Sequence, residues 1–135
     1  MKKIIAVALA AFALNASAFS GNGNDNIESA RSYLYVKHND AYGDSRKVPQ
    51  SFYWSGVVMG LSDAFSNLNY KNAICYPEGT TAGQLAELAA NYLIDNVDQR
   101  QQSLNVLVWI SQAEAFGFMS DESCWNHDLW LEYNG

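Results

Sequence analysis

The spacing of apolar residues is the feature that most constrains how this 135-residue chain can fold. Apolar side chains recur every three or four positions in four separate segments, which is the period of an amphipathic helix. No stretch of useful length alternates between apolar and polar residues, as a half-buried strand does. The sequence therefore predicts a small single-domain all-α protein of four main helices plus a C-terminal segment.

Residues with cap preferences set the expected ends of these helices. Asp25 or Asn26 can cap the first helix, Thr80 or Thr81 can cap the third, and Gly117 can end the fourth. The expected helices cover approximately residues 26–38, 51–68, 81–95 and 103–116. The polar segments between them, which contain most of the remaining Gly and Pro, are expected to form loops at residues 39–50, 69–80 and 96–102.

Two glycines lie four residues apart in the second expected helix, at Gly56 and Gly60. Each costs about 0.5–1 kcal/mol relative to Ala in a helix interior, so we expect compensation from the close backbone approach of a neighbouring helix. Together with Pro77, Gly79 and Gly83, these glycines are expected to meet backbone requirements of the fold rather than to contact a partner.

The first 18 residues have the features of a cleavable signal peptide. Lys2 and Lys3 precede an apolar run over residues 4–14, and Ala-Ser-Ala at 16–18 is the small-x-small pattern of a cleavage site. The run is too short to anchor the chain in a bilayer. The alternative is an amphipathic first helix of the mature protein, but the run is apolar on all sides. We expect a periplasmic or secreted protein whose helical domain covers residues 19–135.

The charge balance argues against nucleic acid as a partner. The chain has 14 acidic and eight basic residues and a net charge of −6. Two of the eight basic residues, Lys2 and Lys3, lie in the expected leader, so the mature chain is still more acidic. Such a chain repels the phosphate backbone. After removal of the leader, no contact with a membrane is expected.

Export also determines how the cysteines, Cys75 and Cys124, are interpreted. In an oxidising compartment an isolated pair is more often a disulfide than a catalytic or metal site. A bond between them would close a loop of about 50 residues and stabilise the fold by roughly 4 kcal/mol before strain is subtracted. The alternative is a nucleophilic thiol, but neither His38 nor His127 lies in the sequence context of a cysteine hydrolase.

Common catalytic motifs are missing from the sequence. It contains no Gly-x-Ser-x-Gly, His-Glu-x-x-His or Cys-x-x-Cys. Residues 22–26 are rich in oxygen ligands but lack the ordered pattern and terminal Glu of a Ca²⁺ loop. His127 beside Asp128 suits a solvated surface pair better than an oriented base. We therefore expect neither an enzyme nor a bound metal or cofactor.

Three segments of the sequence form a recognisable pattern. They are Tyr-Trp-Ser-Gly-Val-Val-Met-Gly-Leu-Ser-Asp-Ala at 53–64, Ile-Cys-Tyr-Pro-Glu-Gly-Thr-Thr-Ala-Gly-Gln-Leu at 74–85, and Asn-Tyr-Leu at 91–93. An aromatic and glycine-containing helix that ends in Asp-Ala, followed by Ile-Cys-x-Pro-x-Gly-x-Thr-x-Gly-Gln-Leu and a helix with Tyr-Leu near its end, is typical of one family. The chain resembles the Rap/Tai family of type VI secretion amidase immunity proteins over residues 52–116.

This resemblance implies a periplasmic, all-helical homodimer that binds a papain-like cysteine amidase delivered between bacteria, forming a heterotetramer with two effectors. Such effectors cut peptidoglycan crosslinks, and the immunity protein protects the producing cell and its kin by blocking the amidase cleft. The resemblance also implies that Cys75 pairs with a second cysteine. Family members place that cysteine directly after the fourth helix, whereas Cys124 follows several residues later.

An inhibitor that plugs a cleft gains specificity from shape and charge, with aromatic anchors and charged neighbours. We expect the contact surface in the loops 39–50 and 69–79, the turn 96–102 and the outward face of the third helix. The predicted partner-binding residues are Tyr70, Tyr76, Glu78, Glu87, Asn91, Asp95 and Arg100. Several have structural alternatives: Glu78 can help to cap the third helix, Tyr76 can be buried beside Cys75, and Asp95 and Arg100 can be solvated loop charges.

The alternative function is that of a small periplasmic acid-stress chaperone, also helical with one disulfide, which opens at low pH to bind unfolded clients. Loss of charge from the 14 carboxyl groups permits such opening, but few basic residues remain to keep the acidified chain soluble. A client-aggregation assay in strong acid discriminates between the two functions. A third reading is an enzyme with an unrecognised site, which activity on purified peptidoglycan would support.

Overall fold

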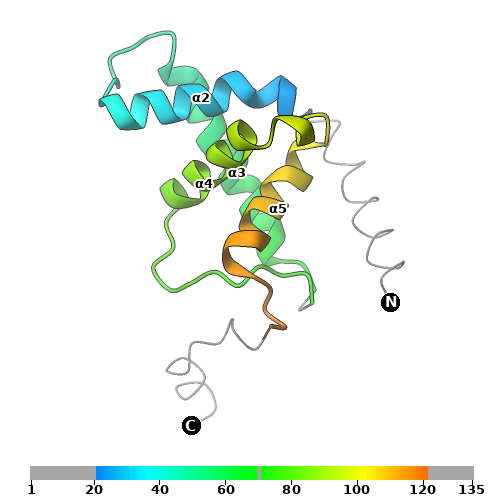
Figure 1. Cartoon of the computed structure of the whole chain (residues 1–135). Coiled ribbons are helices and arrows are strands. Elements are labelled where there is room, and N and C mark those ends of the chain that lie inside the picture. Colours follow the sequence, from blue (N-terminus) through cyan, green and yellow to red (C-terminus); the bar gives the residue numbers. More distant parts are fainter. Residues whose placement is uncertain (1–20, 70, 122–135) are drawn as a thin grey trace.

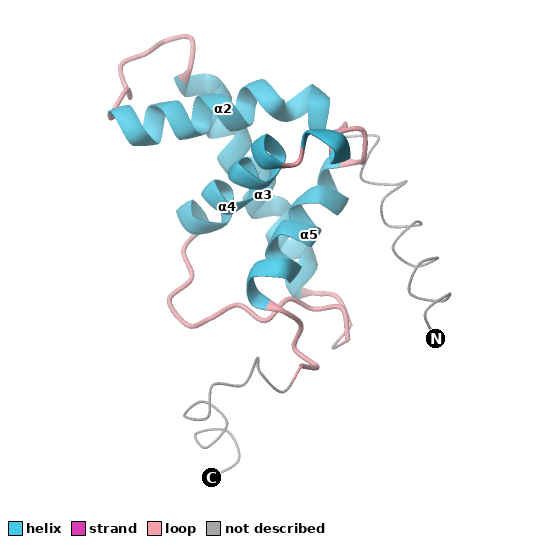
Figure 2. Ribbon diagram, viewed as in Figure 1, coloured by secondary structure: helices cyan, strands magenta, loops and turns pink. Residues whose placement is uncertain are grey.

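The computed structural model describes residues 21–69 and 71–121, which form a helical fold (Figures 1 and 2). Its elements are α2 (Gly23–Asn39), α3 (Val48–Ser66), α4 (Ala82–Asp95), the 3₁₀ helix η1 (Val97–Gln99) and α5 (Leu104–Phe116). No strand occurs within the described residues, so the all-α class is confirmed for them. None of these helices is long and apolar enough to cross a lipid bilayer. The predicted signal peptide, Tyr70 and Cys124 lie outside the described residues.

The first described helix, α2, begins earlier than predicted. Asn22 is its N-cap: Asn22 Oδ1 accepts a hydrogen bond from Asp25 N (3.0 Å), and Asp25 Oδ2 accepts one from Asn22 N (3.0 Å). This reciprocal arrangement is a capping box, which satisfies two backbone donors at once. The prediction that Asp25 or Asn26 caps the helix was therefore wrong, because Asp25 is the third residue of the helix and Asn22 is the cap.

The next helix, α3, begins at Val48, inside the segment predicted to be a loop. Pro49 lies in its first turn, where the missing N–H of proline costs no hydrogen bond and its fixed φ suits a helix. Just before the helix, Asp44 Oδ1 accepts hydrogen bonds from the backbone N of Arg46 (2.9 Å) and Lys47 (3.2 Å). The predicted start near Ser51 was too late, because Pro49 was taken as a loop residue.

The last two helices have the predicted ends. Thr81 caps α4: its Oγ1 accepts from Gln84 N (3.2 Å), while Gln84 Oε1 accepts from Thr81 N (2.9 Å). Helix α5 begins after Ser103 and ends at Phe116, and the C-cap residue Gly117 has a positive φ of 74°, which glycine adopts without strain.

Helix α3 packs against α2, α4 and α5 (Figure 1). Trp54 of α3 is fully buried, and its indole Nε1 donates a hydrogen bond to Ala86 O of α4 (2.8 Å). Three small buried residues, Ala86, Ala89 and Ala90, allow α4 to approach its neighbours closely. The rest of the core comprises mainly Ala30, Tyr33, Val58, Phe65, Ile74, Leu85, Leu93, Leu104, Leu107 and Val108.

The start of α2 is joined to the turn that precedes α5. Gly23 N donates to Gln102 O (3.1 Å), and Asn24 N donates to Arg100 O (3.0 Å), so two free amides of the first helical turn find acceptors. A side chain at Gly23 would lie 2.8 Å from Arg100 O and 2.7 Å from the Leu107 side chain. Only glycine allows this approach.

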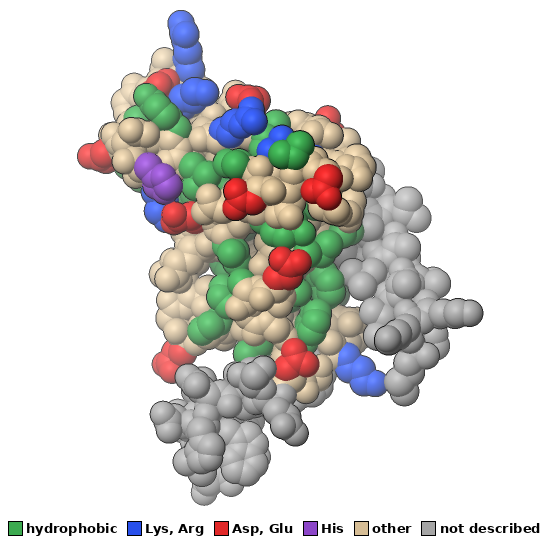
Figure 3. Space-filling model, viewed as in Figure 1, with side chains coloured by type: hydrophobic (Ala, Val, Ile, Leu, Met, Phe, Trp, Pro, Cys, Tyr) green, Lys and Arg blue, Asp and Glu red, His purple; other side chains and the backbone are tan. Residues whose placement is uncertain are grey.

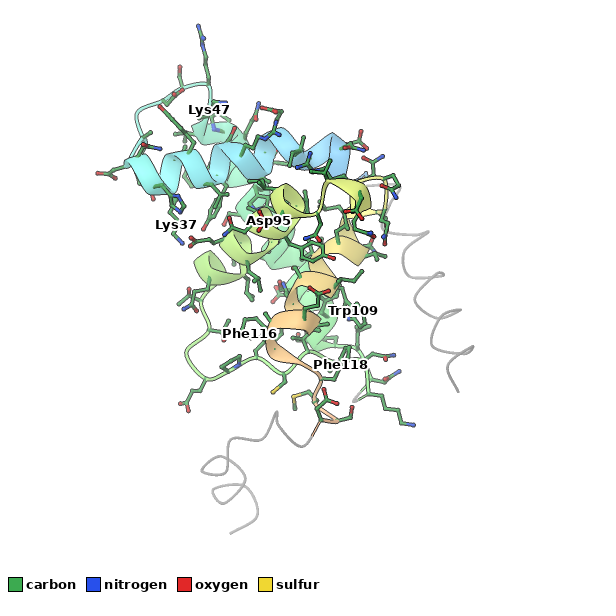
Figure 4. All side chains as sticks on the ribbon, viewed as in Figure 1. Lys37, Lys47, Asp95, Trp109, Phe116 and Phe118 are labelled. Atoms are coloured by element: carbon green, nitrogen blue, oxygen red, sulfur yellow. The ribbon has the colours of Figure 1, made fainter. Side chains whose placement is uncertain are left out.

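The chain after α5 packs back onto the loop between α3 and α4. Cys75 N donates to Gly117 O (2.9 Å), and Ile74 forms an isolated antiparallel bridge with Phe118. The ring of Phe118 lies 5.3 Å from that of Trp109 on α5 (Figure 4). The prediction that the C-terminal segment packs back is thus confirmed for its first residues; the remainder lies outside the described residues.

Candidate functional site

The loop between α3 and α4 ends in a tight, exposed turn over residues 77–80. Thr80 donates both its N–H (3.1 Å) and its hydroxyl (2.6 Å) to Pro77 O. Gly79 has a φ of 80°, as the third residue of a type II turn requires, so its predicted backbone role is confirmed. Glu78 precedes it in an exposed position. Because Thr81 caps α4, the predicted alternative role of Glu78 as a cap is not needed.

Both sides of this turn are fixed to the helical core. After it, Thr81 begins the capping box of α4. Before it, the Tyr76 hydroxyl donates to Gln112 Oε1, and the Tyr76 ring meets the Phe116 ring edge-on with 6.0 Å between centroids. Burial raises the pKa of Tyr76 to about 12, so its hydroxyl keeps its proton, and can donate, well into the alkaline range. The turn is therefore an ordered projection.

A shallow hollow of about 320 Å³ separates the turn from α4 and α5. Pro77 and Gly79 line it on the turn side, and Leu88 and Phe116 line it on the helix side. Phe116 is labelled in Figure 4, where it lies at the end of α5. The hollow adds apolar surface beside the exposed turn.

Three predicted contact residues, Glu87, Asn91 and Asp95, follow one another at four-residue spacing along α4 and therefore share a face of that helix. Asn91 and Asp95 are exposed. Glu87 is engaged instead with α2, since its carboxylate lies 2.6 Å from Lys37 Nζ and 3.2 Å from His38 Nε2. The hydrogen bond from Lys37, followed by that from His38, lowers the pKa of Glu87.

Arg100 holds the end of α4. Its Nε donates to Leu93 O (2.7 Å) and one terminal nitrogen donates to Ile94 O (3.0 Å), two carbonyls in the last helical turn. Arg100 is therefore not a solvated loop charge, and its guanidinium is already engaged within the chain. Of the other predicted contacts, Tyr76 is half-buried, and Tyr70 lies outside the described residues. The predicted set therefore divides between the turn, the exposed face of α4 and residues with structural partners.

The expectation of a helix packed against Gly56 and Gly60 was wrong for the described chain: a side chain added at either glycine would meet nothing within 4 Å. Both glycines lie on the side of α3 opposite its buried residues. They share that side with Phe52 (68% exposed), Tyr53 (47%) and Met59 (46%). We call Phe52, Tyr53, Gly56, Met59 and Gly60 the α3 exposed face. The sequence contained its signal, because large apolar residues and glycines recur there at helical spacing.

The charges are unevenly distributed over the described surface. Basic side chains gather over α2 and the loop that follows it, while acidic side chains are spread across the middle of the face in Figure 3. On α2 and this loop lie Arg31, Lys37, Arg46 and Lys47. No group of three or more His, Cys, Asp or Glu side chains within the described residues has the geometry to hold a metal ion.

Comparison of the chain with protein-family models, with curated proteins and with solved structures found no match.

Proposed function

We propose that this chain is a periplasmic immunity protein that binds and inhibits a peptidoglycan amidase of the papain-like cysteine class, delivered by type VI secretion. The observation that carries the proposal is the segment 74–85, which bears the most specific part of the family resemblance. This segment forms a single ordered unit: an anchored Tyr76, a type II turn and the capping box of α4.

An ordered, projecting turn suits inhibition of an enzyme cleft. A loop that already has its bound shape loses little conformational entropy when it binds, so more of the contact energy becomes affinity. Pro77 restricts the backbone, two hydrogen bonds from Thr80 to Pro77 O close the turn, and Glu78 supplies an exposed charge within it. In this proposal the turn enters the amidase cleft and Glu78 meets a polar or basic group there.

The exposed face of α4 extends the same binding surface. Asn91 and Asp95 lie on the helix that begins directly after the turn, so turn and helix can meet a single partner. Glu87 and Arg100 are assigned to folding rather than to binding, because their side chains already join elements of the chain. Tyr76 contributes mainly by holding the turn, and Tyr70 is retained as a proposed contact.

The α3 exposed face is proposed as the contact between two copies of the chain. Burial of the exposed Phe52 and Met59 side chains against a second copy lowers the free energy, and the two glycines let a second helix approach closely. A twofold interface places each patch against its own copy, so like charges would oppose one another. The five residues of this face carry no charge, which favours a second copy as the occupant; the exposed charge of Asp63 lies next to them, one turn after Met59 and Gly60.

The proposal also retains export through cleavage after residue 18 and a disulfide between Cys75 and Cys124. Cys75 is buried, and its backbone pairs with Gly117, at the start of the segment that leads to Cys124. The described start of that segment therefore lies beside Cys75, which supports the proposed disulfide.

The test uses the oxidised mature protein, residues 19–135, with a panel of type VI amidases, measuring complex mass and peptidoglycan cleavage together. We expect tight binding and loss of cleavage with the cognate amidase. Glu78→Arg should weaken binding about 30-fold, which corresponds to about 2 kcal/mol for a central contact. Glu28→Arg, the same charge change on exposed α2, should bind like the unaltered protein. Absence of binding across a broad panel would refute the proposal, and equal losses in both variants would refute the role of the turn.

A further inference from the structure

A chain of hydrogen bonds crosses the interior from α3 to the loop before α4. Ser62 Oγ donates to Val58 O (2.7 Å), Gln112 Nε2 donates to Ser62 Oγ (2.8 Å), and the Tyr76 hydroxyl donates to Gln112 Oε1. Gln112 is fully buried, and Ser62 is buried as well. We call Ser62, Gln112 and Tyr76 the polar relay.

A buried glutamine is costly unless both ends of its amide are hydrogen-bonded. Gln112 meets this condition, but an apolar residue would also suit the position, since its neighbours one turn before and after it on α5, Val108 and Phe116, belong to the apolar core or pack against it. Packing alone therefore does not account for an amide at this position. Unlike an apolar side chain, the amide requires directional hydrogen bonds. It can be satisfied only when Tyr76 and Ser62 occupy defined positions.

The relay reaches the exposed turn through Tyr76. Gln112 Oε1 accepts a hydrogen bond from the Tyr76 hydroxyl. Phe116 packs against the Tyr76 ring, and it lies on the same face of α5 as Gln112 because it follows four residues later. Tyr76 is thus fixed at its ring and at its hydroxyl. Pro77 follows directly, and its ring restricts the backbone at the first residue of the turn. The position of Tyr76 therefore constrains where the turn 77–80 begins.

We infer that Gln112 is a positioning residue, which acts through Tyr76 to fix the orientation of the turn 77–80 before a partner binds. The inference rests on the proposed function only for its effect on amidase affinity. The order of the turn is a property of the free protein and can be measured without any amidase.

The first arm of the test measures amide hydrogen exchange by NMR in the free protein. Gln112→Met preserves approximate volume and removes both hydrogen bonds. The Thr80 N–H, which closes the turn, should exchange about three- to tenfold faster, relative to core amides outside the relay such as that of Ala30 on α2, because a net hydrogen bond is lost. Tyr76→Phe, a milder change, should give the same local effect. The double variant should add little to either single change.

Ser111→Ala is the matched control. Ser111 is also buried on α5, but its hydroxyl donates to Val108 O within that helix. This variant should leave the exchange of Thr80, relative to core amides, unchanged. Equal acceleration of Thr80 and core amides in Gln112→Met would indicate a general loss of stability and overturn the inference, as would unchanged exchange at Thr80 in Tyr76→Phe.

The second arm measures the affinity of each folded variant for an amidase that binds the unaltered protein. Gln112→Met and Tyr76→Phe should weaken binding about three- to tenfold, whereas Ser111→Ala should not. Faster exchange at Thr80 with unchanged affinity would overturn the connection between the relay and binding. If the unaltered protein binds no amidase, the proposed function fails, while the exchange measurements still decide whether Gln112 positions the turn.

Discussion

Lys37 Nζ lies 2.6 Å from Glu87 Oε2 and thereby joins the C-terminal half of α2 to α4. The second carboxylate oxygen of Glu87 lies 3.2 Å from His38 Nε2. The hydrogen bond between Lys37 and Glu87 is the largest cause of two opposite shifts: the pKa of Glu87 falls below 4.5 and the pKa of Lys37 rises above 10.5. The pair links two helices whose residues are 50 positions apart in sequence.

The first prediction concerns the pH dependence of this pair. The contribution of Glu87 is complete above its unfolded pKa and is lost as the pH falls through its lower folded pKa, whereas that of Lys37 is lost as the pH rises through its higher folded pKa. About a third of each side chain is exposed, so the pair contributes about 0.5 kcal/mol. Glu87→Gln should lower the free energy of unfolding by this amount at neutral pH and not in strong acid, as measured by urea denaturation. A difference that persists in strong acid would contradict the assignment.

The second prediction concerns Gly60 on the α3 exposed face. Nothing within 4 Å opposes a side chain there, so Gly60→Leu should leave the monomer folded and raise its helix stability by about 0.5 kcal/mol. The same side chain should hold two copies apart. Sedimentation should therefore show a shift from dimer to monomer, while Gly43→Leu, in an equally open loop position, should sediment like the unaltered protein. An unchanged dimer in Gly60→Leu would exclude this face as the contact.

The third prediction concerns Asn105, which is buried on α5. Neither atom of its side-chain amide has a hydrogen-bond partner among the described residues. Such a group costs about 1–3 kcal/mol, so Asn105→Leu should raise the free energy of unfolding by about 1 kcal/mol or more. Asn96→Leu, which removes a side-chain donor to Tyr92 O, should instead lower it. Thermal unfolding of both variants measures the contrast, and destabilisation by Asn105→Leu would contradict this prediction.

The fourth prediction separates the two roles considered for Arg100. Because its guanidinium joins two carbonyls at the end of α4, Arg100→Ala should lower the free energy of unfolding by about 1–2 kcal/mol. Binding to an amidase, measured on the folded variant, should change less than twofold. Loss of affinity at unchanged stability would restore Arg100 to the contact surface.

The fifth prediction concerns Cys75. The mass of the oxidised mature protein should be lower by two hydrogens than that of the reduced protein, and peptide mapping should join Cys75 to Cys124. Reduction should lower the free energy of unfolding by up to about 4 kcal/mol. Two free thiols under oxidising conditions would refute the pairing.

Helix ends are predictable from sequence where the satisfying groups are close together in the chain. Thr81 with Gln84, and Gly117 after α5, are local signals of this kind. Asn22 with Asp25 forms the same local pattern. The cap was not identified because several neighbouring Asn and Asp side chains have the same cap preference. The start of α3 was predicted too late because proline interrupts the interior of a helix but is favourable in its first turn, where Pro49 lies.

The contact surface was less predictable, because side-chain partners depend on the tertiary fold. The position of Glu87 in the helical repeat of α4 indicates only that it lies away from the core. The packing of α2 against α4 brings Lys37 to it, and the sequence does not show that packing. Periodicity likewise identifies the buried side of α3 around Trp54 and Val58. It does not indicate whether Gly56 and Gly60 face another helix of the same chain, a second copy or solvent.

The hydrogen bonds from Gly23 and Asn24 to the carbonyls of Gln102 and Arg100 have a consequence for the order of folding. They connect the first described helix to a turn near the end of the described chain, so they close a very long loop, whose entropy is lost before the contact is gained. A chain that emerges from a channel with its N-terminus first cannot complete this junction until residue 102 has passed through. In the proposed export, we therefore expect α2 to remain only partly stabilised until residue 102 has emerged, and cooperative folding of the domain to come last.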